Sequence, residues 1–169
     1  AIMTPEQIDL AATTLWKAAT SASPLPGLPE SAMPRSRADG YAVQQGLARL
    51  SGQQAYGWKI ASTSLAGQKH LNVDGPLGGR LFIDRVLPQT GLISLGGNGM
   101  KLGEAEFAFR MAKDLPPRSN PYTVEEVMAS VGALYPAIEL PDSRFIEYTK
   151  VGAPSLIADN ACAHEFVLG

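Results

Sequence analysis

In the stretch Glu104-Ala105-Glu106-Phe107-Ala108-Phe109-Arg110-Met111, mostly charged side chains alternate with apolar ones. That period of two predicts a β-strand, because successive side chains of a strand point to opposite faces. Glu104 and Glu106 then share one face with Ala108 and Arg110, and the other apolar residues share the opposite face. Two carboxylates one strand repeat apart, with about 6 to 7 Å between their Cβ atoms, can converge on one hard cation. The stretch therefore predicts a strand that carries part of a metal site.

A third carboxylate lies in another short apolar segment, Tyr135 to Leu140. Glu139 stands there between two aliphatic residues, where burial of an unpaired charge would be costly. A cation shared with Glu104 and Glu106 would offset that cost. Three oxygen ligands favour Mg²⁺ or Mn²⁺ over zinc, because no Cys or His occurs at ligand spacing. The alternative is that Glu-x-Glu only solvates the outer face of an edge strand.

The composition favours one globular domain that acts on a small molecule. A chain of 169 residues with 45% apolar content can form one core, and its net charge of −2 gives no reason to expect nucleic acid. The single Cys162 fits a reducing compartment. No apolar run approaches the roughly 18 residues that span a bilayer, and the N-terminus lacks the order of a signal peptide. We expect a cytoplasmic protein with no membrane partner.

The N-terminal third predicts helices. Thr4-Pro5-Glu6-Gln7 has an N-cap residue, a first-turn proline and a capping-box glutamine, so a helix should begin there. The segment from Ser21 to Ser36 holds four prolines and predicts an extended connector or a flap over a site. A second helix should run from after Ser36 to about Leu50. Residues 1–54 thus form a helical region with a Pro-rich connector.

From Tyr56 onward the pattern changes to short strands broken by glycine. A capping box, Thr123-x-x-Glu126, predicts one later helix, which leads into the strand of Glu139. Helices followed mainly by strands indicate an α+β fold with a mixed, mostly antiparallel sheet. Residues 55–169 would be its β-rich, metal-binding catalytic region, within one structural domain. The predicted strands are Tyr56 to Ile60, a region around Leu81 to Val86, Gly91 to Leu95 and the stretch from Glu104.

Five ordered segments resemble the fumarylacetoacetate hydrolase superfamily, and most of all its 2-hydroxypenta-2,4-dienoate hydratases and 4-oxalocrotonate decarboxylases. The resemblance implies a β-roll like the fumarylacetoacetase C-terminal domain. Members of this branch continue well beyond the position of Gly169, so it also implies a sheet truncated at its C-terminus. The segments are Gly57 to Ser64, Val73 to Pro76 with Leu81-Phe82, Glu104 to Phe109, Pro136 to Glu139 with Asp142 to Arg144, and Ile157 to Ala161.

The resemblance implies that Glu104, Glu106 and Glu139 bind Mg²⁺ or Mn²⁺, the trio that spacing also proposes. It makes Lys59 the catalytic acid/base or orienting group, although a lysine between Trp58 and Ile60 in a strand more often extends its ammonium to solvent.

The resemblance also assigns residues around the substrate. It makes Asp74 a second catalytic residue, although an Asp-Gly turn explains Asp74 equally well. It places four residues at the substrate, with the Asp-Asn pair near the metal or its water; a loop cap is the alternative for that pair. Cys162 beside His164 is not expected to be a nucleophile, since sequence neighbours rarely have that geometry. The four are Ser64, Leu71, Asp159 and Asn160.

The expected function is a metal-dependent hydratase that adds water to a 2-hydroxy-2,4-dienoate. A decarboxylase would use the same enolate chemistry and is the second hypothesis. Hydrolytic C–C cleavage would need a base for the attacking water, which the family's hydrolytic branch commonly supplies through a histidine, and neither His70 nor His164 is well placed. A truncated, non-catalytic assembly subunit is the competing class. We expect a homo-oligomer, or a second chain that supplies missing strands, because an unpaired sheet edge promotes association.

Overall fold

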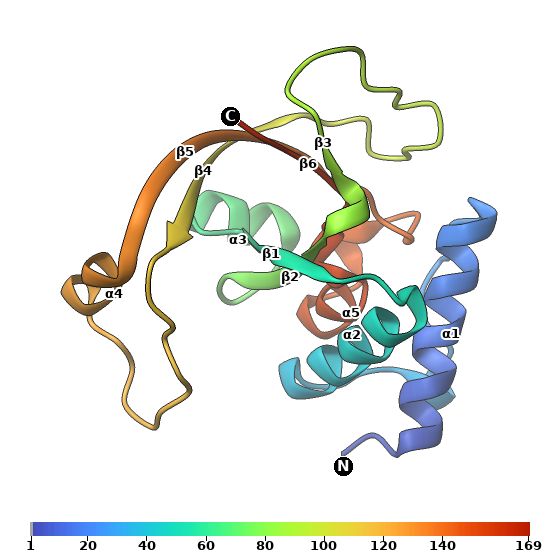
Figure 1. Cartoon of the computed structure of the whole chain (residues 1–169). Coiled ribbons are helices and arrows are strands. Elements are labelled where there is room, and N and C mark those ends of the chain that lie inside the picture. The colour runs from blue at the N-terminus through green and yellow to red at the C-terminus, as the bar shows by residue number, and fades with distance from the viewer. Residues whose placement is uncertain (1) are drawn as a thin grey trace.

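The computed structural model describes residues 2–169 and consists of a helical side and a curved β side. Three helices pack together on the helical side (Figure 1): α1 (Pro5–Ser21), α2 (Arg37–Ser51) and α5 (Ala153–Ala158). Their buried faces meet in a core that includes Leu15 and Val43. A second buried cluster contains Leu156 and Ile157 of α5 with Leu77 of the β side. The helical side therefore packs against the β side through α5 and the strand β2 (Leu77–Phe82).

Local sequence explains where the first two helices begin. Thr4 and Gln7 form the predicted capping box, in which the threonine side chain accepts from the Gln7 N–H and the glutamine side chain accepts from the Thr4 N–H. Ser36 caps α2 by accepting a hydrogen bond from the Asp39 N–H. Both predicted helix starts are confirmed.

The Pro-rich connector packs along the helical side. It contains the short 3₁₀ helix η1 (Glu30–Ala32), and Leu28 is buried in the same core as α1. Leu25 forms an isolated bridge with Phe145. The prediction of an extended connector is confirmed, and the connector does not cover the three glutamates.

Two sheets make up the β side. The strands β1 (Ala55–Ala61) and β2 (Leu77–Phe82) form an antiparallel pair joined through the helix α3 (Leu65–Leu71). The second sheet has the order β3-β6-β5-β4, and within residues 2–169 only its β3–β6 pair is parallel. The predicted mixed, mostly antiparallel sheet is confirmed. Its strands are β3 (Val86–Leu87), β4 (Glu104–Met111), β5 (Val131–Leu140) and β6 (Glu165–Leu168).

The β4–β5 pair turns its acidic face inward. Glu104 lies opposite Glu139, and Phe107 lies opposite Pro136. Phe107 is 79% exposed and Phe109 54% exposed, whereas Glu104 and Glu106 are partly buried. Glu-x-Glu therefore does not solvate an outer face, and the apolar side of β4 is the one that faces outward.

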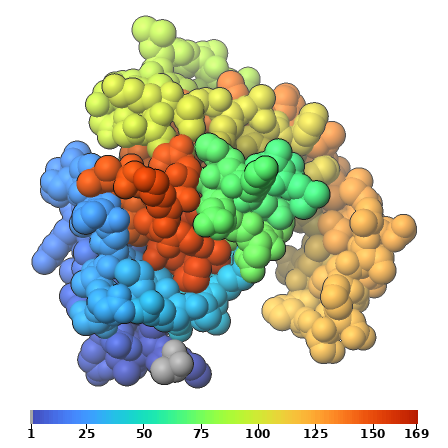
Figure 2. All heavy atoms as spheres, turned by 180° about the vertical axis from the view of Figure 1, so that it is seen from behind, coloured from blue at the N-terminus to red at the C-terminus, as the bar shows by residue number. Residues whose placement is uncertain are grey.

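The remaining segments differ from the sequence prediction in several places. The region around Leu81 to Val86 is not one strand, because the 3₁₀ helix η2 (Ile83–Arg85) separates β2 from β3. Gly91 to Leu95 is not a strand: Gly91 has φ 112°, and Leu92 is fully exposed without a neighbouring strand. The helices α3 and α5 were not predicted, since each is short and neither begins with a capping box. The predicted helix at Thr123 is α4 (Val124–Ser130). Together with the loop before it, α4 belongs to a yellow-orange lobe that projects from the body (Figure 2). In residues 2–169, no helix has the length and apolarity to cross a membrane.

Candidate metal centre

Three glutamates converge where β4 and β5 pair. Glu104 is the direct cross-strand partner of Glu139, and Glu106 is two residues further along β4 on the same face. One carboxylate oxygen from each lies within 4.8 Å of the others. The prediction that these side chains gather is therefore confirmed, and the strand period that places Glu104 and Glu106 on one face is the reason.

Glu139 is the most deeply buried of the three. Its side chain is 1% exposed, and neither of its oxygens has a hydrogen-bond partner among residues 2–169. The Lys59 Nζ atom lies 3.0 Å from Oε1, which supplies opposite charge without hydrogen-bond geometry. A buried carboxylate with free lone pairs is costly unless a further cation compensates it. The residues present therefore fit a divalent ion.

Burial raises the pKa of Glu139 to about 8; the Lys59 ammonium opposes this shift and Glu104 adds to it. Burial also raises the pKa of Glu106, with a further contribution from Glu104 and opposition from Lys59. Burial is the largest cause in both groups and the neighbouring Glu104 adds to it, so a cation held between the carboxylates would favour their charged forms. An all-oxygen donor set suits Mg²⁺ or Mn²⁺.

Lys59 points into the molecule. Its side chain is 9% exposed, and its Nζ donates to the Ala161 carbonyl oxygen at 3.0 Å. The ammonium therefore does not extend to solvent, which rules out the local alternative for this residue. Lys59 belongs to β1 and Glu139 to β5, so the pair joins the two sheets.

A cavity of about 760 Å³ opens between β1 and β4, and Lys59, Glu106 and Glu139 line it. Sequence reasoning missed two polar lining residues, Thr63 and Arg110. Arg110 had a usable signal, because the β4 alternation already places it on the Glu106 face. Its guanidinium stacks on the Tyr135 ring at 5.0 Å. The apolar and aromatic lining also includes side chains from the exposed face of β4; these residues are Tyr56, Trp58, Ile60, Leu81, Phe107, Ala108, Phe109, Met111, Phe166 and Leu168.

Three of the other predicted site residues lie away from this cavity. Asp74 is 81% exposed and pairs with Arg37 at 2.6 Å, and hydrogen bonding to this guanidinium lowers the pKa of Asp74. Ser64 caps α3 by accepting a hydrogen bond from Gly67 N–H. Leu71 packs against the Leu77 cluster. The structure gives each of them a local structural role and brings none of them to the glutamates.

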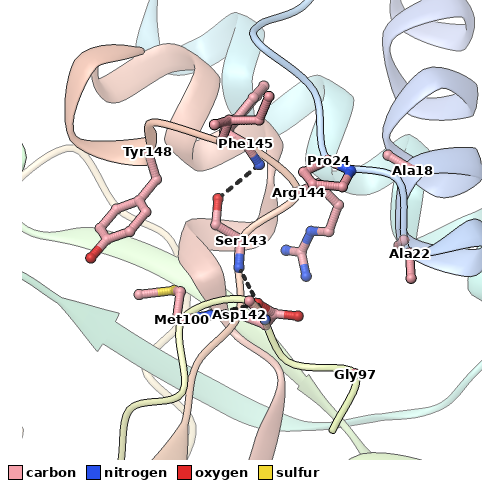
Figure 3. Close-up of a pocket in the computed structure, with 13 residues that line it drawn as sticks. Ala18, Ala22, Pro24, Gly97, Met100, Asp142, Ser143, Arg144, Phe145 and Tyr148 are labelled. Atoms are coloured by element: carbon pink, nitrogen blue, oxygen red, sulfur yellow. Dashed lines mark hydrogen bonds between the residues drawn. The ribbon is translucent and has the colours of Figure 1, made fainter. Parts of the chain in front are cut away.

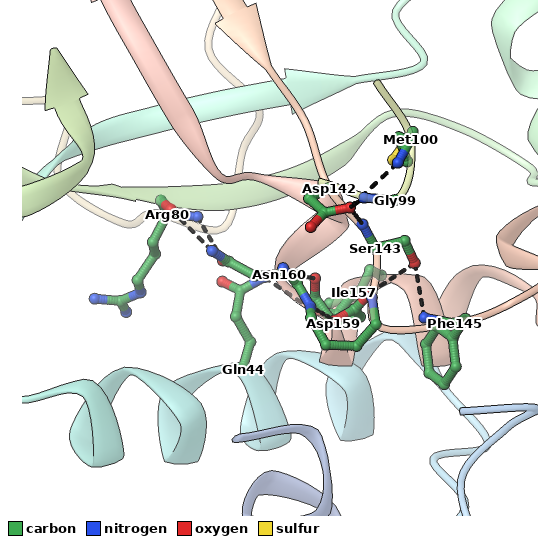
Figure 4. A network of polar contacts seen from close by, with 11 residues as sticks. Gln44, Arg80, Gly99, Met100, Asp142, Ser143, Phe145, Ile157, Asp159 and Asn160 are labelled. Carbon is green, nitrogen blue, oxygen red and sulfur yellow. Dashed lines mark hydrogen bonds and ion pairs between the residues drawn. The ribbon is translucent and has the colours of Figure 1, made fainter. Parts of the chain in front are cut away.

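Asp159 and Asn160 belong to a buried polar network (Figure 4). Asp159 forms an ion pair with Arg144 and accepts from the Ser143 hydroxyl at 2.9 Å. The Asn160 side chain bonds to both backbone groups of Arg80. Neither side chain lines the cavity, so the structure does not place this pair beside the three glutamates.

Cys162 and His164 are not an activated pair. Burial raises the pKa of the Cys162 thiol to about 12, so the thiol stays protonated. Burial, with Arg85 and Arg144 nearby, lowers the pKa of His164 to about 4. The expectation that they form no nucleophile is consistent with both shifts.

A smaller cavity of about 270 Å³ lies between the C-terminal end of α1 and the segment after β5 (Figure 3). Asp142 lines it and accepts hydrogen bonds from the backbone of Gly99 and Ser143. Arg144 also lines it but is already paired with Asp159. These two polar side chains of the smaller cavity make contacts within the fold, and two of the three clustered glutamates, Glu106 and Glu139, line the larger cavity.

Known proteins share this sequence over nearly its whole length. The chain is 33% identical to the 2-keto-4-pentenoate hydratase of Paraburkholderia xenovorans LB400 over 170 aligned residues, which cover 99% of the chain and 62% of that protein. It is 36% identical to 2-keto-4-pentenoate hydratase 2 of Dechloromonas aromatica RCB, covering 99% of the chain and 63% of the relative. No family model matches the sequence.

The fold agrees with a solved structure. The 4-oxalocrotonate decarboxylase from Pseudomonas putida G7, complexed with magnesium and adipate, superposes with a TM-score of 0.84 at 25% identity. The match covers 99% of this chain and 64% of the decarboxylase chain. The chain thus spans less than two thirds of the length of these relatives. It is homologous over nearly its whole length to the 2-keto-4-pentenoate hydratases and 4-oxalocrotonate decarboxylase, a branch of the fumarylacetoacetate hydrolase superfamily.

Proposed function

We propose that the chain carries the metal-binding and catalytic part of a hydratase that acts on a 2-hydroxy-2,4-dienoate. The observation that carries this proposal is the cluster of Glu104, Glu106 and Glu139 next to Lys59; of these four residues, Lys59, Glu106 and Glu139 line one large cavity. The product would be a 4-hydroxy-2-oxo acid. Work in the cytoplasm of an aromatic-degrading cell is part of the proposal.

The three glutamates would hold Mg²⁺ or Mn²⁺. When bound there, the ion would supply positive charge that stabilises an enolate. Lys59 would move the proton as the dienol becomes the ketone, since its ammonium lies among the groups that line the cavity. Arg110, fixed over Tyr135 on the Glu106 face, would bind the substrate carboxylate.

Decarboxylation is the second candidate reaction. The superposition on the magnesium-bound and adipate-bound decarboxylase favours it, whereas the hydratase relatives favour hydration. Loss of CO₂ from oxalocrotonate would use the same charge stabilisation, with Lys59 again placed to handle the proton. The two reactions differ in substrate and product, which makes them separable by experiment.

Association is the third part of the proposal. β1 and β4 are each paired on one side only, and the outer face of β4 exposes Phe107 and Phe109. Unpaired strand edges and exposed aromatic side chains favour association with another polypeptide. We propose a homo-oligomer or a second chain that supplies further strands. A non-catalytic assembly subunit would need the same surfaces but not the charged cluster.

The test is incubation of the chain with 2-hydroxypenta-2,4-dienoate and, separately, with oxalocrotonate in the presence of Mg²⁺. Loss of the dienol absorbance without CO₂ supports the hydratase, and CO₂ release from oxalocrotonate supports the decarboxylase. Turnover of neither compound, together with no stabilisation by Mn²⁺, would support the non-catalytic subunit.

A further inference from the structure

We propose that the left-handed segment Asn160–Cys162 is a device that positions Lys59, and that Gly79 and Asn160 are the positioning residues that fix it. The inference rests on the proposed function for the role of Lys59 in catalysis. It adds residues that touch neither the three glutamates nor the cavity. It starts from the left-handed backbone conformation of this segment, which none of its three residue types favours as a run.

Three consecutive non-glycine residues in this segment have positive φ. The values are 59° for Asn160, 50° for Ala161 and 62° for Cys162. Side chains disfavour this region, and it is normally visited by single residues. A run of three persists only where the surroundings determine it, and such strain concentrates at functional sites. The segment therefore needs contacts that hold it.

The Asn160 side chain supplies one of these contacts. Its Oδ1 accepts from the Arg80 N–H at 2.7 Å, and its Nδ2 donates to the Arg80 carbonyl at 2.9 Å. It thereby satisfies both backbone groups on the side of β2 that β1 does not pair (Figure 4). The left-handed segment is thus registered against β2.

Gly79 allows the second contact, because it has no side chain to keep the segment away from β2. A Cβ at this position would lie 2.2 Å from the Asn160 carbonyl oxygen and 3.0 Å from Ala163 Cβ. Gly79 is also the cross-strand partner of Lys59, and partners in a sheet share a face. The bare backbone at Gly79 therefore lets the segment lie directly beside the lysine side chain.

These contacts fix the position of the Lys59 ammonium group. Nζ of Lys59 donates to the Ala161 carbonyl at 3.0 Å and lies 3.0 Å from Oε1 of Glu139. An ammonium has three donors, and the Ala161 carbonyl accepts one of them, so donors remain for a reacting molecule. Without the left-handed turn, the Ala161 carbonyl would point elsewhere, and the lysine would lose one of its two anchors.

The test compares Gly79→Ala with Gly78→Ala. The control residue is the preceding glycine of the same strand, where an added Cβ would meet its nearest neighbour, the Tyr41 hydroxyl, at 3.4 Å. Two readouts are measured: the rate at which an amine reagent labels Lys59, mapped by mass spectrometry with exposed Lys17 as reference, and the kcat and KM for the dienoate.

Gly79→Ala should label Lys59 faster and lower kcat by at least about tenfold, while KM stays within about threefold. Gly78→Ala should change neither. If Gly79→Ala fails to fold by circular dichroism, Asn160→Ala is measured in its place against the same expectation. A folded variant with the parental labelling rate and kcat would overturn the proposal. If the parent chain shows no turnover, the proposed function fails, while the labelling rates still decide whether the segment positions Lys59.

Discussion

Lys59 Nζ lies 3.0 Å from Oε1 of Glu139, and this ion pair joins the two-stranded sheet to the four-stranded sheet. Both side chains are almost completely buried. The lysine alone leaves both oxygens of Glu139 without a hydrogen bond in the described part of the chain. This arrangement supports the proposal that the site holds one more cation.

Mn²⁺ should raise the melting temperature of the chain. A ligand that binds only the folded state at about 100 times its Kd stabilises by about 2.7 kcal/mol. Glu106→Ala should lose this response, because it removes one of the three ligands. Glu125→Ala, which deletes an exposed glutamate of α4, should keep it. Equal shifts in both variants, measured by differential scanning fluorimetry, would exclude the cluster as the binding site.

Lys59→Met should keep the Mn²⁺ response and lose turnover. The substitution retains the apolar stem and removes the group proposed to move the proton. Lys17→Met on the exposed face of α1 is the matched control and should retain parental rates. If turnover of the dienoate by Lys59→Met stays within about tenfold of the parent, or roughly 1.4 kcal/mol of barrier, Lys59 is not the main proton-transfer group.

The metal-free chain should lose stability as pH rises from about 4.5 towards about 8 through Glu139. Its pKa is raised in the folded state, so over this range the folded state keeps a proton that the unfolded state has released. The unfolding free energy should therefore fall by at most about 1.4 kcal/mol per pH unit. Urea unfolding at several pH values measures it.

The control for this pH dependence is Glu139→Gln, which should flatten the fall. His164 acts in the opposite direction, because its folded pKa is lowered to about 4 and the unfolded state binds the extra proton up to about pH 6.5. The difference between parent and variant isolates Glu139. An identical slope in both would show that this carboxyl does not titrate in that window.

Asp159→Asn should destabilise the fold strongly. It leaves the buried Arg144 guanidinium without its counter-ion, a change that typically costs about 3–5 kcal/mol. Asp74→Asn breaks an exposed pair with Arg37 and should leave the urea midpoint almost unchanged. The same Asp74 variant tests its predicted catalytic role: parental turnover would remove Asp74 from the mechanism.

Replacement of Phe107 and Phe109 by serine should reduce association of the chain. Both residues are more than half exposed, although they also contribute to the lining of the larger cavity, and a partner polypeptide would bury them. Sedimentation velocity of parent and double variant at matched concentrations measures the effect. A parent that is monomeric at all concentrations would contradict the proposed homo-oligomer.

Local sequence determined those features that depend on neighbours along the chain. The alternation from Glu104 to Met111 fixed a strand with two carboxylates on one face, because side-chain direction in a strand repeats every two residues. The capping boxes at Thr4 and Thr123 fixed two helix starts, since their hydrogen bonds span only three residues. The motifs from Gly57 to Ala161 were sufficient to indicate the family.

Only the tertiary structure decided which of those faces became buried and which of the other predicted acidic residues stayed away from the three glutamates. Cross-strand pairing set Glu104 opposite Glu139, and it left the phenylalanine face of β4 exposed. Asp74 went to the surface and Asp159 to a buried ion pair, although both are acidic residues in loops or helix ends by sequence. The reason is that burial and charge pairing depend on residues distant in the chain, which the local pattern does not specify.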